Sequence, residues 1–438
     1  MDTARWPARH FDSLPSPLRS VQLLREISQQ ASAFEPVICT APVLLYGAGA
    51  LGKMAHRYFT RLNIPVAGVV DANPALRGAD PQWAGVEIQH WQDVSMEVRS
   101  SALLAICVVT CPFTDVIAPL DDAGWARIVP FYDIAEAYRD RHPLSNGWHA
   151  GVLTTEDMEN IETVFTGWSD PVSRAHHLQF IAWRAARQEW LFRGAPVTLE
   201  GRFFIPEVCA ALGANEVFLD VGAHHGSVSR RFIEERGGCY QGVVAVEPDS
   251  ESHGVLCRQL GALPGWADGR IRAERVALSA EAGQQPFFAG LGYASQISAL
   301  GEGSIPVRTL DSLEVPASMI KLHVEGAEPE VLAGAMQTIT RHRPILCLTA
   351  YHARSGLWRL PLQLMEHLSG YQYLFRLHGW CGTGAVLYAL PQERVKIPGF
   401  RLGVVPKSGV ISIRQASQRS SAARQVSWRE LPGRQTFE

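Results

Sequence analysis

The sequence lacks the features that mark several classes of protein. Its eight cysteines are scattered and include no Cys-x-x-Cys pair, which argues against a disulfide framework and fits a reducing cytoplasm. Basic and acidic residues nearly balance at a net charge of −3, so no nucleic-acid partner is expected. The longest apolar stretch, residues 102–109, is too short to cross a bilayer, and residues 1–20 contain no apolar targeting segment. We therefore expect a soluble, cytoplasmic protein with no membrane partner.

The chain has 438 residues, enough for two domains with connecting segments. One helix is expected near residues 18–34, and two more at 156–165 and 173–192. Ser, Arg and Gln dominate residues 415–424, which is typical of a disordered tail. The predicted divisions are a helical arm (1–40), a Rossmann-like domain (41–140), a helical connector (141–202), a larger α/β domain (203–400) and a tail (401–438).

Residues 42–71 have the pattern of the first βαβ unit of a Rossmann fold. A strand leads into Gly47-x-Gly49-x-x-Gly52, and the next strand ends on Asp71, about where a ribose-binding carboxylate belongs. Two interpretations stay open. The turn binds NAD(P) or another nucleotide, or it is purely structural, since a lone glycine fingerprint is a weak signal. No later Tyr-x-x-x-Lys pair supports short-chain reductase chemistry.

Alternating strands and helices continue beyond this unit. Strands are expected at 85–88, 103–109 and 127–132, and this alternation indicates a parallel sheet with helices on both faces.

The most informative stretch of the chain runs from residue 216 to residue 232. An apolar strand at 217–221 leads into a glycine turn, and a helix begins near Ser227. The spacing Asp220-x-Gly222-x-x-x-Gly226 differs from a dinucleotide fingerprint and is typical of the turn that binds S-adenosylmethionine (SAM) in class I methyltransferases. Glycine allows close approach of a ligand, and amides at a helix start favour electron-rich groups.

A second carboxylate supports the same interpretation. The apolar strand 242–248 ends with Glu247, which can accept hydrogen bonds from both hydroxyls of a ribose. A third strand, 270–279, places Ala277 where the adenine edge is expected. The predicted SAM-binding residues are Asp220, Gly222, Ala223, His224, Gly226, Glu247 and Ala277.

The remaining pattern completes a second α/β sheet. Short accessory strands are expected at 284–289 and 305–310, and a helix at 331–339. Further strands are expected at 319–324, 344–350, 371–377 and 385–390, with a helix at 360–368. The predicted fold class is α/β, with two doubly wound sheets.

Several motifs of the second half occur together in one known family. They are FLDVGAHHGSVS, VVAVEPDSES, RVALSAEAG, VRTLDSL and IKLHVEGAEPEVLAGA followed by HRPILCLTAYH. Through them, residues 203–390 resemble the FkbM family of SAM-dependent methyltransferases. His224 stands where the family usually has Asn, and His323 stands where Asp is common. The resemblance implies a class I methyltransferase fold and transfer to a hydroxyl of a sugar, glycan or natural product. It implies no metal.

Candidate catalytic residues lie at the ends of two strands of this sheet. His323 and Glu325 end the strand at 319–324, and His352 follows the strand at 344–350. Period-two alternation places His323 and Glu325 on one face. A neutral imidazole can accept the proton of the acceptor hydroxyl. We expect His323 or His352 to be that base, with Glu325 orienting it or the acceptor. A rival interpretation makes these residues, with His224, ligands of a metal.

Two other functions stay open from the sequence. The first is an NAD(P)-dependent oxidoreductase or sugar-modifying enzyme that uses the N-terminal domain. The second is a non-catalytic nucleotide-binding scaffold, which the acidic pair Asp220 and Glu247 argues against. Neither the acceptor nor the oligomeric state can be read from the sequence.

Overall fold

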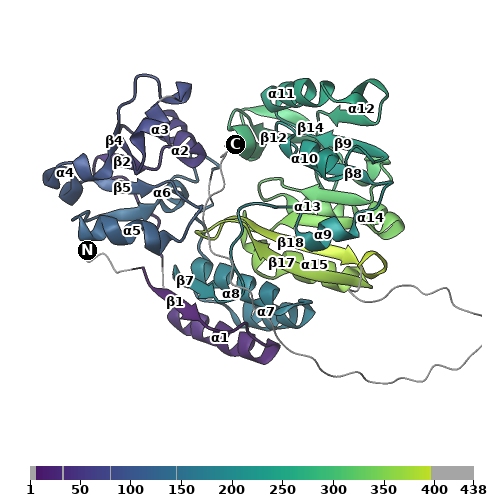
Figure 1. Ribbon diagram of the computed structural model, residues 1–438, viewed down its shortest axis with the longest axis horizontal. Helices are drawn as coiled ribbons and strands as arrows, with labels where there is room; N and C mark the ends of the chain where they lie inside the picture. The colour runs from purple at the N-terminus through teal and green to yellow at the C-terminus, as the bar shows by residue number, and fades with distance from the viewer. Residues whose placement is uncertain (1–5, 32–33, 79, 145, 396–438) are drawn as a thin grey trace, which may run out of the picture. The chain divides into compact units, whose positions relative to one another are not determined.

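The strands of the described residues form four separate sheets. The structure is a computed structural model that describes residues 6–31, 34–78, 80–144 and 146–395. The sheets contain seven, five, four and two strands. The five-stranded sheet belongs to the purple and blue part of the chain, and the seven-stranded sheet to the teal-to-yellow part (Figure 1). The described residues belong to one compact unit that ends at Val395. The predicted tail, 401–438, lies outside them.

The five-stranded sheet is parallel throughout, with the order β4-β3-β2-β5-β6. Its first strand lies in the middle and later strands are added outward, as in a doubly wound sheet. The predicted parallel arrangement is confirmed. Its strands are β2 (Val43–Tyr46), β3 (Val66–Asp71), β4 (Ile88–His90), β5 (Leu103–Ile106) and β6 (Ile128–Pro130). Its helices are α2 (Ala50–Arg61), α3 (Pro74–Gly78), α4 (Met96–Ser101), α5 (Phe113–Asp122) and α6 (Phe131–Ala137).

The seven-stranded sheet has the order β10-β9-β8-β15-β16-β18-β17. Only β18 runs against the others, between β16 and β17. This confirms the predicted class I methyltransferase arrangement. The strand order changes direction between β8 and β15, and such a switch point opens a crevice at the carboxyl ends of the strands. The strands are β8 (Val217–Val221), β9 (Gly242–Val246), β10 (Ile271–Glu274), β15 (Met319–Leu322), β16 (Ile345–Thr349), β17 (Tyr371–Leu377) and β18 (Ala385–Pro391).

Both faces of this sheet are buried under helices. Alternate residues of a strand point to opposite faces, so neighbouring residues belong to different core clusters. Leu219 belongs to a core cluster with Phe180 of α8 (Pro171–Ala186) and Leu364 of α15 (Arg359–His367). Phe218 belongs to another with Phe232 of α10 (Ser227–Glu235) and residues of α11 (Ser250–Gly261). The short helices α9 (Pro206–Ala211) and α12 (Pro264–Ala267) complete the set before β10.

Two predicted elements of this half are divided in the structure. The expected strand 270–279 splits into β10 and β11 (Ala277–Leu278), which belong to different sheets. The expected helix 331–339 splits into α13 (Glu328–Ala333) and α14 (Met336–His342). Gly334 lies between them, and a Cβ there would lie 2.3 Å from the carbonyl oxygen of Ser279. The chain therefore passes against neighbouring backbone at this point.

The four-stranded sheet follows the order β11-β14-β12-β13. It consists of β11, β12 (Gly283–Phe288), β13 (Gln296–Ile297) and β14 (Gly303–Arg308). The accessory strands predicted at 284–289 and 305–310 correspond to β12 and β14, which pair antiparallel. This small sheet supplies one wall of the cavity described below.

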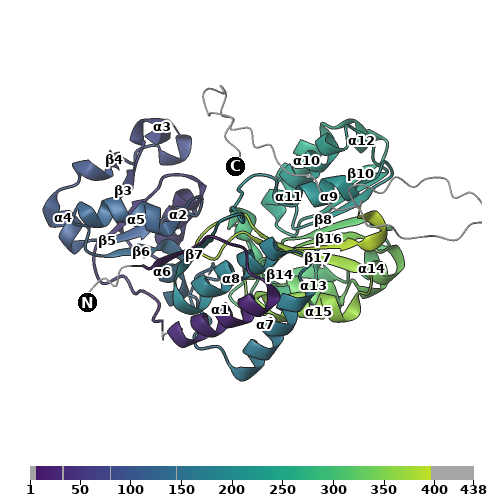
Figure 2. The ribbon, with the colours of Figure 1, turned by 60° about the horizontal axis from the view of Figure 1, so that its bottom comes forward.

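The predicted arm and connector differ from expectation at two points. The helix expected at 173–192 ends at Ala186, because Arg187 is left-handed with a φ of 50°. Residues 189–192 form a strand, β7 (Glu189–Phe192), that pairs in parallel with an unpredicted strand, β1 (Ala8–Phe11). The first helix, α1 (Pro17–Gln30), stops short of residue 34. Figure 2 shows α1 beside α8 and α7 (Thr155–Gly167), which it contacts.

Helix α8 is buried on nearly every side and carries a fully buried arginine. The Arg184 guanidinium donates to the carbonyl oxygens of Asn146, Trp148, Tyr351 and Gly382, at 2.7–3.0 Å. It thereby connects the segment before α7 with the segments that follow β16 and β17. Among the described residues, no helix is long and apolar enough to cross a bilayer.

Candidate active site

The glycine turn after β8 is closed against the end of β15. Gly222 has a φ of +74°, and a Cβ there would lie 1.9 Å from the carbonyl oxygen of His323. Gly226 has a φ of +85°, and its Cβ would meet Leu256 of α11 at 2.7 Å. Both positions therefore need glycine for conformation and for space. His224, between them, also adopts a left-handed backbone, with a φ of 49°.

Asp220 lies beneath this turn rather than on its ligand side. Its carboxylate is fully buried, 2.9 Å from Lys321 Nζ, and accepts a hydrogen bond from Ser229. Lys321 also donates to the carbonyl oxygen of Gly222 at 2.5 Å. Asp220 does not line the cavity described below, and its contact with a cofactor stays a prediction. Asp220 supports the turn through Lys321, which contacts both its carboxylate and the carbonyl oxygen of Gly222.

Glu247 holds the turn from the neighbouring strand. One of its carboxylate oxygens accepts from the backbone N–H of His224 at 2.7 Å, and the other accepts from that of Asp249 at 2.9 Å. Burial raises the pKa of Glu247 to about 7, although these two hydrogen bonds work in the opposite direction. The carboxylate thus sits at the end of β9 with a fixed orientation.

A cavity of about 630 Å³, partly open to solvent, lies at the carboxyl ends of β8, β9 and β15. Four of the predicted SAM-binding residues line it: Gly222, His224, Glu247 and Ala277. Asp220, Ala223 and Gly226 do not line it. Ala223 is buried and its carbonyl accepts from the N–H of Gly226, so its part is to close the turn. SAM binding by the lining residues stays a prediction.

The small sheet adds lining residues that the sequence motifs do not indicate. They are Phe287, Gly292, Tyr293, Ser295, Gln296 and Ile297. The loop that carries Ser295 is fixed by Asp249, whose carboxylate accepts from the Ser295 hydroxyl and from the N–H of Gly290, both at 3.1 Å.

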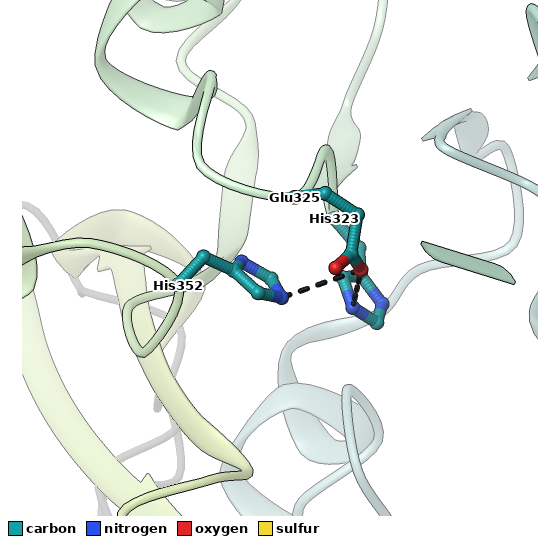
Figure 3. A group of neighbouring side chains, drawn as sticks. All are labelled: His323, Glu325 and His352. Atoms are coloured by element: carbon teal, nitrogen blue, oxygen red, sulfur yellow. Dashed lines mark ion pairs between the residues drawn. The ribbon is translucent and has the colours of Figure 1, made fainter. Parts of the chain in front are cut away.

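The three predicted catalytic residues meet at one point (Figure 3). Both imidazole rings point toward the carboxylate of Glu325. Oε1 of Glu325 lies 3.1 Å from Nε2 of His323 and 3.3 Å from Nε2 of His352. His323 and Glu325 line the cavity, whereas His352 lies behind them with a side chain only 3% exposed.

The reason for this meeting differs from the predicted alternation. Strand β15 ends at Leu322, and Glu325 and Gly326 have left-handed backbones with φ of 53° and 107°. The chain therefore turns back after β15 and returns the carboxylate of Glu325 to His323. The predicted proximity of His323 and Glu325 is correct, but strand alternation does not produce it, because β15 ends before both residues.

Burial and neighbouring charges shift the pKa values of His323 and His352 in opposite directions. Burial lowers the pKa of His323 to about 3, although Glu325 opposes the shift. Burial acts in the same direction on His352, but the carboxylates of Glu325 and Glu328 outweigh it and raise the pKa of His352 well above its ordinary value. Burial alone would raise the pKa of Glu325, yet the charge of His352 and hydrogen bonds from both imidazoles lower it. The two shifts are opposite in sign, so His323 holds a proton less readily than an ordinary histidine and His352 holds one more readily.

Comparison with known proteins identifies the second half. Residues 220–375 match the family model described as the methyltransferase FkbM domain. This chain contains an FkbM methyltransferase domain. The predicted family is confirmed for residues 220–375, and this match supports a methyltransferase.

One solved structure agrees with the fold, and a second is only weakly similar. The structure of methyltransferase FkbM from Methylobacillus flagellatus KT is 17% identical, has a TM-score of 0.53, and covers 86% of this chain and 94% of its own. At that identity the likeness concerns the fold alone. A precorrin-6y C5,15-methyltransferase from Geobacter metallireducens GS-15 is 14% identical, covers 44% of this chain and 90% of its own, and has a TM-score of 0.26, which carries no argument. No protein with a curated description matches the chain.

Sequence reasoning missed Glu328 of the FkbM domain. Its carboxylate lies 2.8 Å from Nδ1 of His352 and also accepts from Thr349 and from the backbone N–H groups of Val324 and Gly326. From the sequence alone, an acidic residue at the start of a helix is expected to interact with the N-terminus of that helix. Only the return of the chain after β15 shows that it orients His352.

Two further residues reach the site from other elements. Tyr351 Oη lies 3.2 Å from Nε2 of His323, and Arg202 donates to the same oxygen at 3.1 Å. Arg202 precedes the FkbM match, and no motif marks it.

The N-terminal glycine turn stays outside this site. Asp71 accepts from the backbone N–H groups of Ala48 and Asn73, both at 2.8 Å, and so is used within the turn. A Cβ on Gly52 would lie 1.9 Å from the carbonyl oxygen of Gly47, whereas one on Gly49 would meet nothing within 4 Å. The turn's own packing accounts for Gly47 and Gly52. No comparison supports the NAD(P) prediction for Gly47, Gly49, Gly52 and Asp71.

Proposed function

We propose that the protein is a SAM-dependent methyltransferase that acts on a hydroxyl of a sugar, glycan or natural product. The observation that carries the proposal is one cavity lined by two chemically distinct groups of residues. Gly222 and Glu247 form the first group, here called the cofactor end, and His323 and Glu325 form the second, here called the acceptor end. Such an arrangement holds a cofactor beside the groups that activate an acceptor. The hydroxyl class of acceptor comes from the family resemblance of residues 203–390.

The residues of the first end fit SAM. Gly222 lets the turn pack directly against the end of β15, and the carboxylate of Glu247 can accept from ribose hydroxyls. Ala277 and Leu278 offer an apolar wall for an adenine. When bound, SAM supplies a methyl group on a positively charged sulfur.

The second end is suited to a hydroxyl acceptor, whose proton must leave when the new carbon–oxygen bond forms. His323 and Glu325 face the cavity and present nitrogen and carboxylate groups to it. His352 and Tyr351 fix these two residues from behind. We assign removal of the acceptor proton to this cluster. Alignment and proton removal are the two contributions that the chain itself makes to the rate.

Calorimetric titration with S-adenosylhomocysteine tests the cofactor end. We expect micromolar binding by the wild type and its loss in Glu247→Ala. Glu274→Ala is the matched control, because Glu274 ends the adjacent strand β10 but does not line the cavity. Absence of binding in the wild type, or equal loss in both variants, would contradict the proposal. A panel of glycans and hydroxylated small molecules, scored by mass for one added methyl group, then tests the acceptor class.

A further inference from the structure

The cluster of His323, Glu325 and His352 has the composition of a metal site. One ligand atom from each residue lies within 4.8 Å of the other two. Nε2 atoms of both histidines converge on the same carboxylate oxygen, at 3.1 and 3.3 Å (Figure 3). Donors that share a tetrahedral ion at bond lengths of about 2.0–2.1 Å lie roughly 3.3 Å apart. The two nitrogen–oxygen distances, 3.1 and 3.3 Å, are therefore close to the distance between two ligand atoms of one tetrahedral ion.

His352 is oriented as metal-binding histidines are. Its Nδ1 lies 2.8 Å from the carboxylate of Glu328, which accepts the N–H. The other nitrogen, Nε2, is buried and points toward Glu325, whose carboxylate oxygen lies 3.3 Å away. A carboxylate behind a histidine fixes its tautomer and turns its free nitrogen toward an ion.

From these contacts we propose that His323, Glu325 and His352 bind one divalent transition-metal ion of the zinc type, which displaces the proton on Nε2 of His352 to solvent. Two imidazoles and one carboxylate suit zinc and its first-row neighbours, whereas magnesium and calcium prefer oxygen ligands throughout. Glu328 does not bind the ion but orients His352.

The site deepens the proposed function and rests on it. Because His323 and Glu325 line the cavity, the open coordination position faces the space assigned to the acceptor. A hydroxyl bound there loses its proton more readily, since the ion stabilises the alkoxide. The oxygen–hydrogen bond breaks and the proton passes to water. His323 and His352 then act as ligands, in place of the base role predicted from the sequence.

Cobalt spectroscopy on the full-chain protein tests the site. The protein is stripped with a chelator, dialysed and titrated with Co²⁺, and binding is read from the visible absorption bands. We expect one equivalent, with the spectrum of nitrogen and oxygen ligands. Zn²⁺ should displace it. Glu325→Gln should abolish the bands, and Glu328→Gln should weaken binding by about 10–100-fold. His367→Ala is the control, because His367 is exposed and bonds only within its own helix.

Three results would overturn the inference. They are absence of the bands in the wild type, bands from thiolate ligation alone, and an unchanged spectrum in Glu325→Gln. The wild-type spectrum needs no variant, so the inference stays testable if Glu325→Gln does not fold. S-adenosylhomocysteine binding is measured on the same samples. Binding without the cobalt site overturns the metal inference alone, whereas the cobalt site without binding overturns the proposed function.

Discussion

Lys321 and Asp220 form a buried ion pair between the central strands of the seven-stranded sheet. Nζ of Lys321 lies 2.9 Å from Oδ1 of Asp220, and neither side chain is more than 2% exposed. The same ammonium group donates to the carbonyl oxygens of Val221 and Gly222. The pair therefore joins strand β15, which leads into the His–Glu–His cluster, to the glycine turn of the cofactor end.

Breaking this pair should destabilise the protein strongly. Lys321→Ala leaves Asp220 charged and buried without its cation, a change that typically costs about 3–5 kcal/mol. Chemical denaturation followed by fluorescence measures the loss. Arg343→Ala, which removes the exposed pair with Glu393, should cost about 1 kcal/mol or less. Equal losses in the two variants would contradict the structural role given to Lys321.

Adding one methyl group to the glycine turn should remove cofactor binding. In Gly222→Ala the new Cβ would lie 1.9 Å from the carbonyl oxygen of His323, so the turn must deform. We expect S-adenosylhomocysteine titration to show no binding by this variant. Gly49→Ala, in the N-terminal turn, meets nothing within 4 Å and should bind as the wild type does. Wild-type affinity in Gly222→Ala would show that the cofactor does not depend on this turn.

Cofactor affinity should rise with pH near neutrality. The pKa of Glu247 is raised to about 7 by burial, so the carboxylate of the free protein is mostly protonated at pH 6 and mostly ionised at pH 8. Ribose hydroxyls donate to the ionised form, so binding should be about tenfold tighter at pH 8 than at pH 6. Calorimetry at both values measures this ratio. Glu247→Gln should bind more weakly, with little dependence on pH. A wild-type affinity that is flat across this range would contradict the contact.

Removing His323 should separate catalysis from cofactor binding. His323→Ala takes one group from the acceptor end and leaves Glu247 and its contacts in place. We expect turnover to fall on the order of 10²-fold or more, because the acceptor proton is no longer removed efficiently. S-adenosylhomocysteine affinity should stay close to that of the wild type. Methyl transfer at the wild-type rate would exclude His323 from the reaction.

Local patterns in the sequence were enough to predict most elements of the fold. Apolar runs of strand length predicted β8, β9, β15 and β16, because a parallel sheet buried on both faces needs continuous apolar strands. Two errors came from tertiary contacts. The strand at 270–279 divides because its second part pairs with β14. The helix at 173–192 ends early because residues 189–192 pair with β1, more than 150 residues before them.

By itself, the sequence determined the α/β class, the FkbM resemblance and the residue types at the strand ends. These depend on spacing and composition, which are local properties. Tertiary structure decided which of those residues face the cavity. Asp220 and Glu247 are both acids at strand ends, yet one is paired with Lys321 below the turn and the other lines the cavity. Tertiary structure also places Glu328 behind His352. This position depends on a left-handed turn at Glu325 and Gly326, which strand alternation does not predict.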